Sequence, residues 1–157
     1  MSDPRPNPQR PDAGLTTVEL MLTLVVLAIL AAVALPSFRG ILLEARRSDA
    51  ILALAQIQQA QERRRAEQPV YTGTLGSGGL DLPGRSPSGH YQLATSVSAG
   101  SEATAYTATA TARNGQLDDT PCTHLRVEMS AGRITQRSGS DATFANDELN
   151  NRRCWKH

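Results

Sequence analysis

Residues 14–36 read GLTTVELMLTLVVLAILAAVALP, and the rest of the chain is organised around them. No charged side chain occurs from Leu20 through Phe38, a run of 19 residues. That length predicts a helix that spans the hydrocarbon core of a bilayer, which is roughly 30 Å thick. Glu19 stands directly before the run, and Gly14 lies five residues before Glu19. A glycine and an acid at the start of an anchor are the feature to be explained.

Two general interpretations of this anchor leave that feature unexplained. A cleaved secretory signal could use the small residues 32–34 as its cleavage site, but it requires a basic segment ahead of the apolar run. Residues 1–13 instead hold four prolines and equal numbers of acidic and basic side chains, which predicts a polar tail without regular helix. An uncleaved single-pass anchor gives Gly14 and Glu19 no role.

Residues 14–21, GLTTVELM, resemble the class III signal of type IV prepilins, commonly GFTLIELM. The resemblance implies that prepilin peptidase cleaves after Gly14 on the cytoplasmic side and that the new first residue, Leu15, is N-methylated. It also implies that Glu19, the fifth residue of the mature chain, acts in filament assembly. Leu15 and Thr17 replace the common Phe and Leu, and the threonine has no physical explanation.

The proposed role of Glu19 also follows from its chemistry. A carboxylate at membrane depth is costly unless it is paired. Cleavage after Gly14 creates an α-amino group on Leu15, and methylation keeps that amine cationic. In a helical stack of subunits, Glu19 of one chain can pair with the Leu15 amine of its neighbour. Since buried ion pairs fix geometry more than they add stability, we expect this pair to set the register of assembly.

The sequence from Leu20 to about Gln68 predicts one long helix. Pro36 removes a backbone hydrogen bond inside it, so we expect a kink or the exit from the membrane there. Pilins carry a proline at the matching position. Beyond Gly40 the pattern is amphipathic, which predicts one face for a sheet. The expected apolar stripe consists of Ala50, Leu54, Ile57 and Gln61, with Ile51, Ala55 and Gln58 beside it.

A small α+β head is expected after the helix. Residues 69–88 are rich in glycine and proline and predict a loop. Four alternating stretches then predict strands that form an antiparallel sheet, with one face on the helix stripe. The expected fold is therefore a long N-terminal helix packed on a four-stranded antiparallel sheet. The expected strands are His90–Val97, Ala103–Ala112, Thr123–Met129 and Gly132–Arg137.

The two cysteines, Cys122 and Cys154, are the only ones in the sequence. An even count behind an export or membrane segment favours a disulfide, which resembles the bridge that closes the pilin D-region. A bridge across 31 intervening residues contributes about 4 kcal/mol in the chain-entropy description. The enclosed segment 138–153 is polar, and we expect it to form a loop.

The resemblance divides the chain into four parts. Residues 1–14 are the leader, 15–38 the transmembrane and filament-core helix, 39–68 the amphipathic half of the helix, and 69–157 the head with its connecting and disulfide loops. The pattern from Tyr91 and Tyr106 to Cys154 and Trp155 resembles PilE-like minor pilins of beta- and gammaproteobacteria.

The C-terminal tail carries a candidate DNA contact. Cations interleaved with an aromatic ring can hold a phosphate backbone and stack a base. The alternative is a solvated terminus, with Trp155 either at the edge of the core or exposed. The candidate residues are Arg152, Arg153, Trp155 and Lys156.

The leading hypothesis is a non-enzymatic structural subunit of a type IV pilus, major or minor, that supports twitching motility, adhesion or DNA uptake. A type II secretion pseudopilin and a DNA-binding competence pilin are the alternatives. The resemblance implies other pilin subunits, prepilin peptidase and the inner-membrane assembly machinery as partners. The chain would sit in the inner membrane with its head in the periplasm and then join the extracellular pilus. No sequence pattern indicates an enzyme, a metal site or a cofactor, since the three histidines share no ligand spacing.

Overall fold

The structure, a computed structural model, describes residues 14 and 16–156. It divides into two compact units, Met1–Phe38 and Arg39–His157, and we call the second unit the head. The first helix, α1, covers Thr17–Glu67 and so belongs to both units. The predicted leader residues 1–13 and the predicted methylation site, Leu15, lie outside the described residues.

Thr16 begins α1 as its capping residue. Its hydroxyl oxygen accepts a hydrogen bond from the backbone N–H of Glu19 at 3.2 Å. The Glu19 carboxylate then lies in the first turn, where the helix dipole favours a negative charge. The large apolar side chains from Val18 to Phe38 are 49–74% exposed. By length and composition α1 can therefore cross a membrane.

The long helix is confirmed, and it continues without a break through Pro36. The kink expected at Pro36 stays a prediction.

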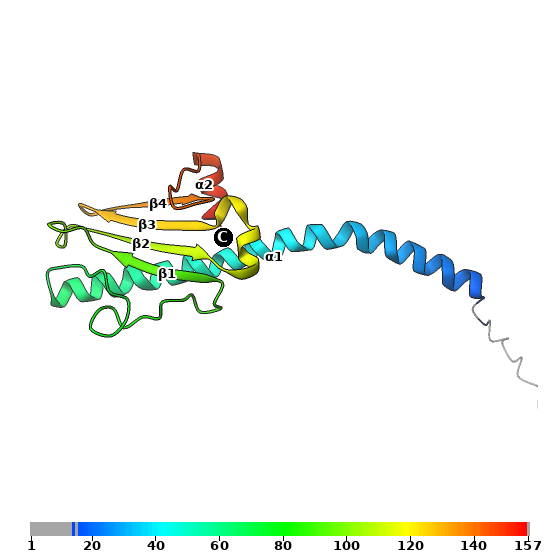
Figure 1. Ribbon diagram of the computed structural model, residues 1–157, viewed down its shortest axis with the longest axis horizontal. Helices are drawn as coiled ribbons and strands as arrows, with labels where there is room; N and C mark the ends of the chain where they lie inside the picture. Colours follow the sequence, from blue (N-terminus) through cyan, green and yellow to red (C-terminus); the bar gives the residue numbers. More distant parts are fainter. Residues whose placement is uncertain (1–13, 15, 157) are drawn as a thin grey trace, which may run out of the picture. The chain divides into compact units, whose positions relative to one another are not determined.

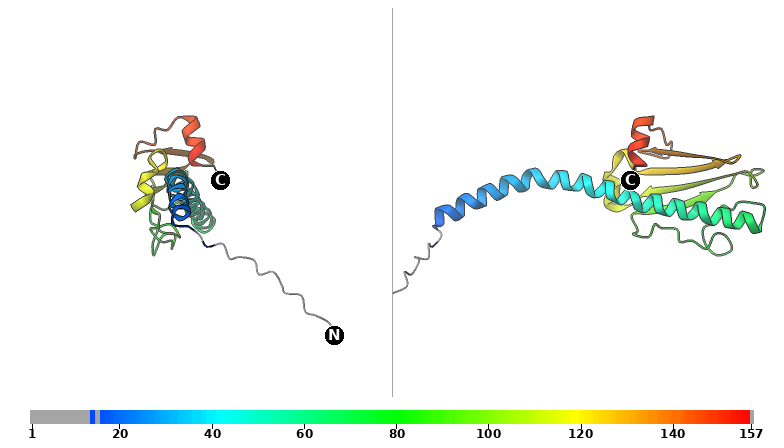
Figure 2. Two further views of the ribbon diagram at one scale, coloured as in Figure 1. Left: turned by 90° about the vertical axis from the view of Figure 1, so that its right-hand side faces the viewer. Right: turned by 180° about the vertical axis from the view of Figure 1, so that it is seen from behind.

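The head contains the predicted four-stranded antiparallel sheet (Figure 1). Each strand pairs with the next in the chain, so the spatial order equals the sequence order. The loop after α1 lies on the side of β1 (Tyr91–Ser96), and the short helix α2 (Glu148–Cys154) lies on the side of β4 (Arg133–Gly139), as views from the front and from behind both show (Figures 1 and 2). The strands are β1 (Tyr91–Ser96), β2 (Ala105–Ala112), β3 (His124–Ser130) and β4 (Arg133–Gly139).

The alternation in β2 explains which face of the sheet is buried. Tyr106, Ala108, Ala110 and Ala112 are buried, whereas the threonines between them are only partly buried. Successive side chains of a strand point to opposite faces, so the alanines form the inner face against α1 and the threonines form the outer face. The sequence predicted this alternation correctly.

The prediction of the buried stripe of α1 is confirmed at the centre of the stripe and wrong at its flank. The predicted residues Ala50, Leu54, Ile57 and Gln61 are almost fully buried. The flank expected at Ile51, Ala55 and Gln58 is not the buried one, because Ala55 is exposed and the other two are partly exposed. Two alanines at helical spacing complete the stripe instead, namely Ala53 and Ala60. Their small side chains belong to the same buried core cluster as the alanines of β2.

The end of α1 is tied to the loop that follows it. Gln61 is fully buried, and its amide donates to the Thr72 carbonyl at 2.7 Å and accepts from the Thr72 N–H at 3.0 Å. The Gln61 amide thus forms the same two hydrogen bonds with Thr72 that a neighbouring strand would form. Both its donor and its acceptor have a partner, so this polar residue can be buried inside an apolar stripe.

The predicted disulfide is confirmed, whereas the prediction that the enclosed segment 138–153 is a loop is wrong. Cys122 and Cys154 are bonded, with their Cα atoms 5.4 Å apart. The segment expected to be a loop contains the end of β4 and a short helix, α2 (Glu148–Cys154). Asp147 caps α2 by accepting the N–H of Asn150 at 2.8 Å. The sequence does contain the signals of this helix, namely an aspartate at the cap position and basic residues in the last turn. The polar composition of the segment favoured a loop instead.

Two buried tyrosines predict how the head responds to alkaline pH. Burial is the main cause that raises the pKa of both Tyr91 and Tyr106 above the ordinary value of 10.0. A raised pKa in the folded state stabilises the fold below pH 10, and this contribution is lost as the pH rises above it. We therefore expect the free energy of unfolding, measured by urea titration, to fall steadily above about pH 10.

The variant Tyr106→Phe tests the cause of that loss. The Tyr106 hydroxyl is buried without a hydrogen-bond partner among the described residues, so its removal should leave stability at neutral pH unchanged or slightly higher. The variant should also lose less stability than the wild type between neutral and alkaline pH. An unchanged alkaline loss would show that Tyr106 does not contribute to it.

Candidate nucleic-acid interface

The outer face of the sheet, on the side away from α1, carries a concentration of arginines. Arg126 of β3 lies directly opposite Arg137 of β4, and Arg133 lies opposite Ser130. Side chains of directly paired residues share a face, so these three arginines are on the face of the β2 threonines. On this face Arg126 is in register with Thr109 of β2.

Two further arginines reach the outer face from outside the strands. Arg85 forms an isolated bridge with Gln92 of β1. Arg113 follows β2, and its guanidinium donates to the side-chain oxygen of Gln92 at 3.3 Å. Gln92 is in register with Thr111, which places it on the outer face. We define the outer face by Arg85, Gln92, Thr107, Thr109, Thr111, Arg113, His124, Arg126, Glu128, Arg133, Thr135 and Arg137.

The outer face has an excess of positive charge. Within this defined set of residues Glu128 is the one carboxylate, and its oxygen lies 3.5 Å from the Arg126 guanidinium. The basic residues of the chain are almost all arginines, since Lys156 is the single lysine. A guanidinium offers a planar fork of donors that matches phosphate oxygens, which a lysine ammonium does not. The face therefore has the charge and the donor geometry of a phosphate-binding surface.

A loop from 140 to 147 covers one corner of this face. Phe144 is buried at a positive φ of 54°, with the Arg126 guanidinium 4.6 Å from its ring centroid. Gly139 permits this approach, because a Cβ there would come within 2.8 Å of the Phe144 Cα. Hydrogen bonds from Thr143 hold the pKa of the Asp141 carboxyl below its ordinary value. These contacts fix the loop against Arg126.

Polar groups also line a shallow pocket of about 340 Å³ at the exposed edge of β4. Gln136 and Arg137 lie on its strand side, while Asn151 of α2 donates to the Gln136 carbonyl at 2.9 Å. Arginine and amide side chains are the groups that read base edges in nucleic acids. The pocket adjoins the outer face because Thr135 and Arg137 belong to both.

A second polar cluster lies beside α1 and next to α2. Arg47 forms a bidentate pair with the carboxylate of Asp119, with both N–O distances 2.8 Å. The hydrogen bonds to Asp119 raise the pKa of Arg47 above its ordinary value. Gln116 also donates to Asp119 at 3.1 Å and to the Tyr91 hydroxyl at 3.0 Å. Because this arginine is paired and largely buried, it is not available to an external anion.

The predicted tail contacts are brought together only in part. Arg152 is ion-paired with Glu148 one turn earlier in α2. Trp155 is partly buried and packs against the core, which agrees with the core-edge interpretation and leaves less of its ring free to stack. Arg153 and Lys156 are exposed. A DNA contact by Arg152, Arg153, Trp155 and Lys156 therefore stays a prediction.

Sequence reasoning missed the outer face. Arg126, Arg133 and Arg137 stand at the polar positions of the alternating strands, and this signal was visible. Arg85 and Arg113 lie outside every strand, so only the register of Gln92 brings them to the same face.

Residues 36–126 match the model of a family described as "Type IV minor pilin ComP, DNA uptake sequence receptor". The chain belongs to this family. The match covers more than half of the chain, from the middle of α1 to β3. No curated protein matches the sequence.

The family places this minor pilin in a type IV pilus as a structural subunit that associates with other pilus components. The exposed apolar part of α1 is consistent with membrane anchoring and with a pilus. The type IV pilin resemblance is confirmed, whereas the narrower likeness to PilE-like minor pilins is not.

The opposed arginines Arg126 and Arg137 predict a stability cost. Like charges directly across two strands repel, so Arg137→Gln should raise the free energy of unfolding by roughly 0.2–1 kcal/mol at low salt. The gain should shrink at high salt, because ions screen exposed charges. Urea titrations at two salt concentrations measure both effects.

Arg133→Gln is the matched control, since Arg133 faces Ser130 and has no opposed cation. Its stability should change little. A loss of stability in Arg137→Gln at low salt would contradict the repulsion.

Proposed function

We propose that this minor pilin captures DNA on the outer face of its sheet and presents it to the pilus for uptake. The observation that carries the proposal is the set of five arginines on one open face with a single carboxylate among them. Phosphate contacts by arginine supply most of the affinity of a protein for DNA and make it depend on salt. The threonines between the arginines are short, so a duplex backbone can lie close to the strands.

The description of the family supports this proposal, because it names a receptor for a DNA uptake sequence. A receptor that selects a sequence needs base contacts in addition to phosphate contacts. The pocket at the edge of β4 offers them, since Arg137 suits guanine and Gln136 suits adenine. Phosphates would bind across the outer face, and bases would be read at the edge of β4.

Arg133→Gln and Arg137→Gln test the interface. Each variant, as the full chain in neutral detergent, should bind a fluorescent DNA duplex more weakly. For each phosphate that the variant no longer neutralises, the slope of log affinity against log salt should become shallower by about 0.9. Fluorescence anisotropy over a range of salt concentrations measures both quantities. Arg63→Gln is the control, because Arg63 is exposed on α1 and is not part of the outer face.

The double variant Arg153→Gln/Lys156→Gln separates the outer face from the tail. If this variant loses affinity while the outer-face variants keep it, DNA binds at the C-terminal tail and the proposed interface is wrong. If only the outer-face variants lose affinity, the tail is excluded.

We also propose how the subunit enters the filament. Prepilin peptidase removes residues 1–14 by cleavage between Gly14 and Leu15, and Leu15 is then methylated. Residues 15–38 hold the subunit in the inner membrane and later join the filament core, while 39–68 and 69–157 form the periplasmic head. The division of the structure after Phe38 and the capped start of α1 at Thr16 support this arrangement. The role has no catalytic step, and the pilin family favours a pilus over a type II secretion system.

Glu19→Ala tests the assembly step. The alanine variant should be cleaved and inserted normally but should be depleted from sheared pili, because the amine of its neighbour loses its partner at a cost of roughly 3–5 kcal/mol. Immunoblots of the membrane and pilus fractions measure the ratio. Glu19→Asp keeps the charge and should retain part of the incorporation. Normal incorporation of the alanine variant would exclude the role of Glu19.

A further inference from the structure

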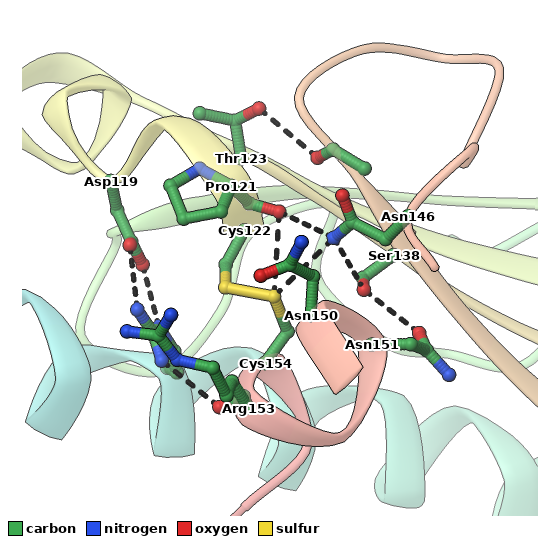
Figure 3. The surroundings of a disulfide bond; sticks show 12 residues. Asp119, Pro121, Cys122, Thr123, Ser138, Asn146, Asn150, Asn151, Arg153 and Cys154 are labelled. Atoms are coloured by element: carbon green, nitrogen blue, oxygen red, sulfur yellow. Dashed lines mark hydrogen bonds and ion pairs between the residues drawn. A yellow bond between two sulfur atoms is a disulfide. The ribbon is translucent and has the colours of Figure 1, made fainter. Parts of the chain in front are cut away.

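Arg47 contacts both chain segments that carry the cysteines. Its guanidinium donates to both oxygens of the Asp119 carboxylate at 2.8 Å and, through Nη1, to the Arg153 carbonyl at 3.0 Å. Asp119 lies three residues before Cys122, and Arg153 directly precedes Cys154. Figure 3 shows Asp119 and Arg153 at the side of the sulfur–sulfur bond, with dashed lines that mark these contacts.

Both contacts are rigidly linked to the sulfur atoms. The Asp119 carbonyl accepts the N–H of Cys122 at 2.8 Å across the short 3-10 helix η2 (Thr120–Cys122). Arg153 and Cys154 are neighbours in α2, which Asp147 caps. When Arg47 holds Asp119 and the Arg153 carbonyl, it therefore fixes the positions of both cysteines.

A second contact holds the same segments from the other side. The side-chain amide of Asn146 donates to the Pro121 carbonyl at 2.7 Å and to the Ser138 hydroxyl at 2.9 Å. Its nitrogen also lies 3.6 Å from the Cys154 sulfur. Non-covalent bonds therefore close the loop around the bridge independently of the sulfur–sulfur bond (Figure 3).

The Arg47–Asp119 pair is largely shielded from solvent, whereas the contact of Arg47 with the Arg153 carbonyl is exposed. The Arg47 side chain is 11% exposed and the Asp119 side chain 4%, and both cysteines are fully buried. A charge-assisted bidentate pair in such surroundings is stronger than an exposed one and also more directional. Lysine could not reproduce it, because an ammonium lacks the planar fork that reaches two partners at once.

We infer that Arg47 is a template for disulfide formation, holding Cys122 and Cys154 side by side in the reduced chain so that the bridge closes quickly. The cysteines are separated by 32 positions, and a flexible chain of that length gives an effective thiol concentration of only about a millimolar. The β3–β4 hairpin returns the chain to Gly139 opposite His124, but residues 140–153, which lead on to Cys154, are mostly polar and supply little apolar drive to bring it to Cys122. Contacts from α1, a helix that forms locally, supply that ordering instead.

The chemistry needs an external disulfide as the oxidant. The thiolate of one cysteine attacks the oxidant's disulfide, forming a mixed disulfide and releasing one thiol of the oxidant. The second cysteine thiolate then attacks the mixed disulfide, forming the Cys122–Cys154 bond and releasing the second thiol. Two electrons and two protons pass from the two cysteines to the oxidant, so the exchange is balanced. Arg47 acts on the second step, since that step requires the two cysteines to meet.

The experiment measures closure of the mixed disulfide. The full chain in neutral detergent is reduced, freed of reductant, exposed to oxidised glutathione and quenched at intervals with a bulky maleimide. Gel mobility and mass then separate the dithiol, the mixed disulfide and the bridged form. Arg47→Gln and Asp119→Asn should each slow closure about tenfold or more, because closure then falls toward the lower effective concentration of a less ordered loop. The double variant should be no slower than the singles, because the pair acts as a unit.

Neighbouring residues provide matched controls. Arg46→Gln and Asp118→Asn remove the same charges one position away, where neither side chain has a hydrogen-bond partner among the described residues, and both should close at the wild-type rate. In concentrated urea the wild type and all of these variants should close at one rate, because the template is then unfolded.

Leu125→Ala separates templating from general loss of stability. Leu125 is fully buried in β3 and does not contact the Arg47 cluster through any hydrogen bond, so its truncation destabilises the reduced head by another route. Circular dichroism determines the folded fraction of each reduced variant. If Leu125→Ala, at equal folded fraction, closes as slowly as Arg47→Gln, or if Arg47→Gln closes at the wild-type rate, the template is excluded. Slow closure confined to Arg47→Gln and Asp119→Asn supports it.

Discussion

The packing of α1 on the inner face of the sheet is the contact on which the head depends. Ala50, Ala53 and Ala60 of the helix and Ala108 and Ala110 of the strand are all buried. Small side chains each bury little apolar area and so contribute little hydrophobic free energy. A core of this kind reaches adequate stability only with additional fixed contacts.

Those additional contacts are polar or covalent, and they surround the alanine layer. Gln61 fastens the loop after α1, the Arg47–Asp119 pair fastens the segment before the disulfide, and the Cys122–Cys154 bond fastens the C-terminus. Each is buried and each has its partners, which is the condition under which a buried polar group stabilises a fold. The head therefore relies on few, well-defined bonds in addition to its apolar core.

The same packing leaves the other face of the sheet free. Because α1 covers only the inner face, the alternating residues of β2, β3 and β4 point outward without a covering layer, except where the 140–147 loop lies over Arg126. A face that contributes no core can carry like charges at a modest cost in stability. The repulsion between Arg126 and the opposite Arg137 is such a cost, and a negatively charged ligand on this face would relieve it.

The sequence by itself determined the long helix, the four strands, their buried phase and the pairing of the two cysteines. These features follow from local periodicity and from an even cysteine count, which need no knowledge of distant contacts. Only the tertiary structure decided that Ala53 and Ala60, and not Ala55, complete the buried stripe of α1. It also decided that the disulfide loop contains the helix α2, and that Arg85 and Arg113 join the three strand arginines on the outer face. Each of these depends on the rotation of a helix or the register of a strand, which contacts between residues far apart in the chain determine.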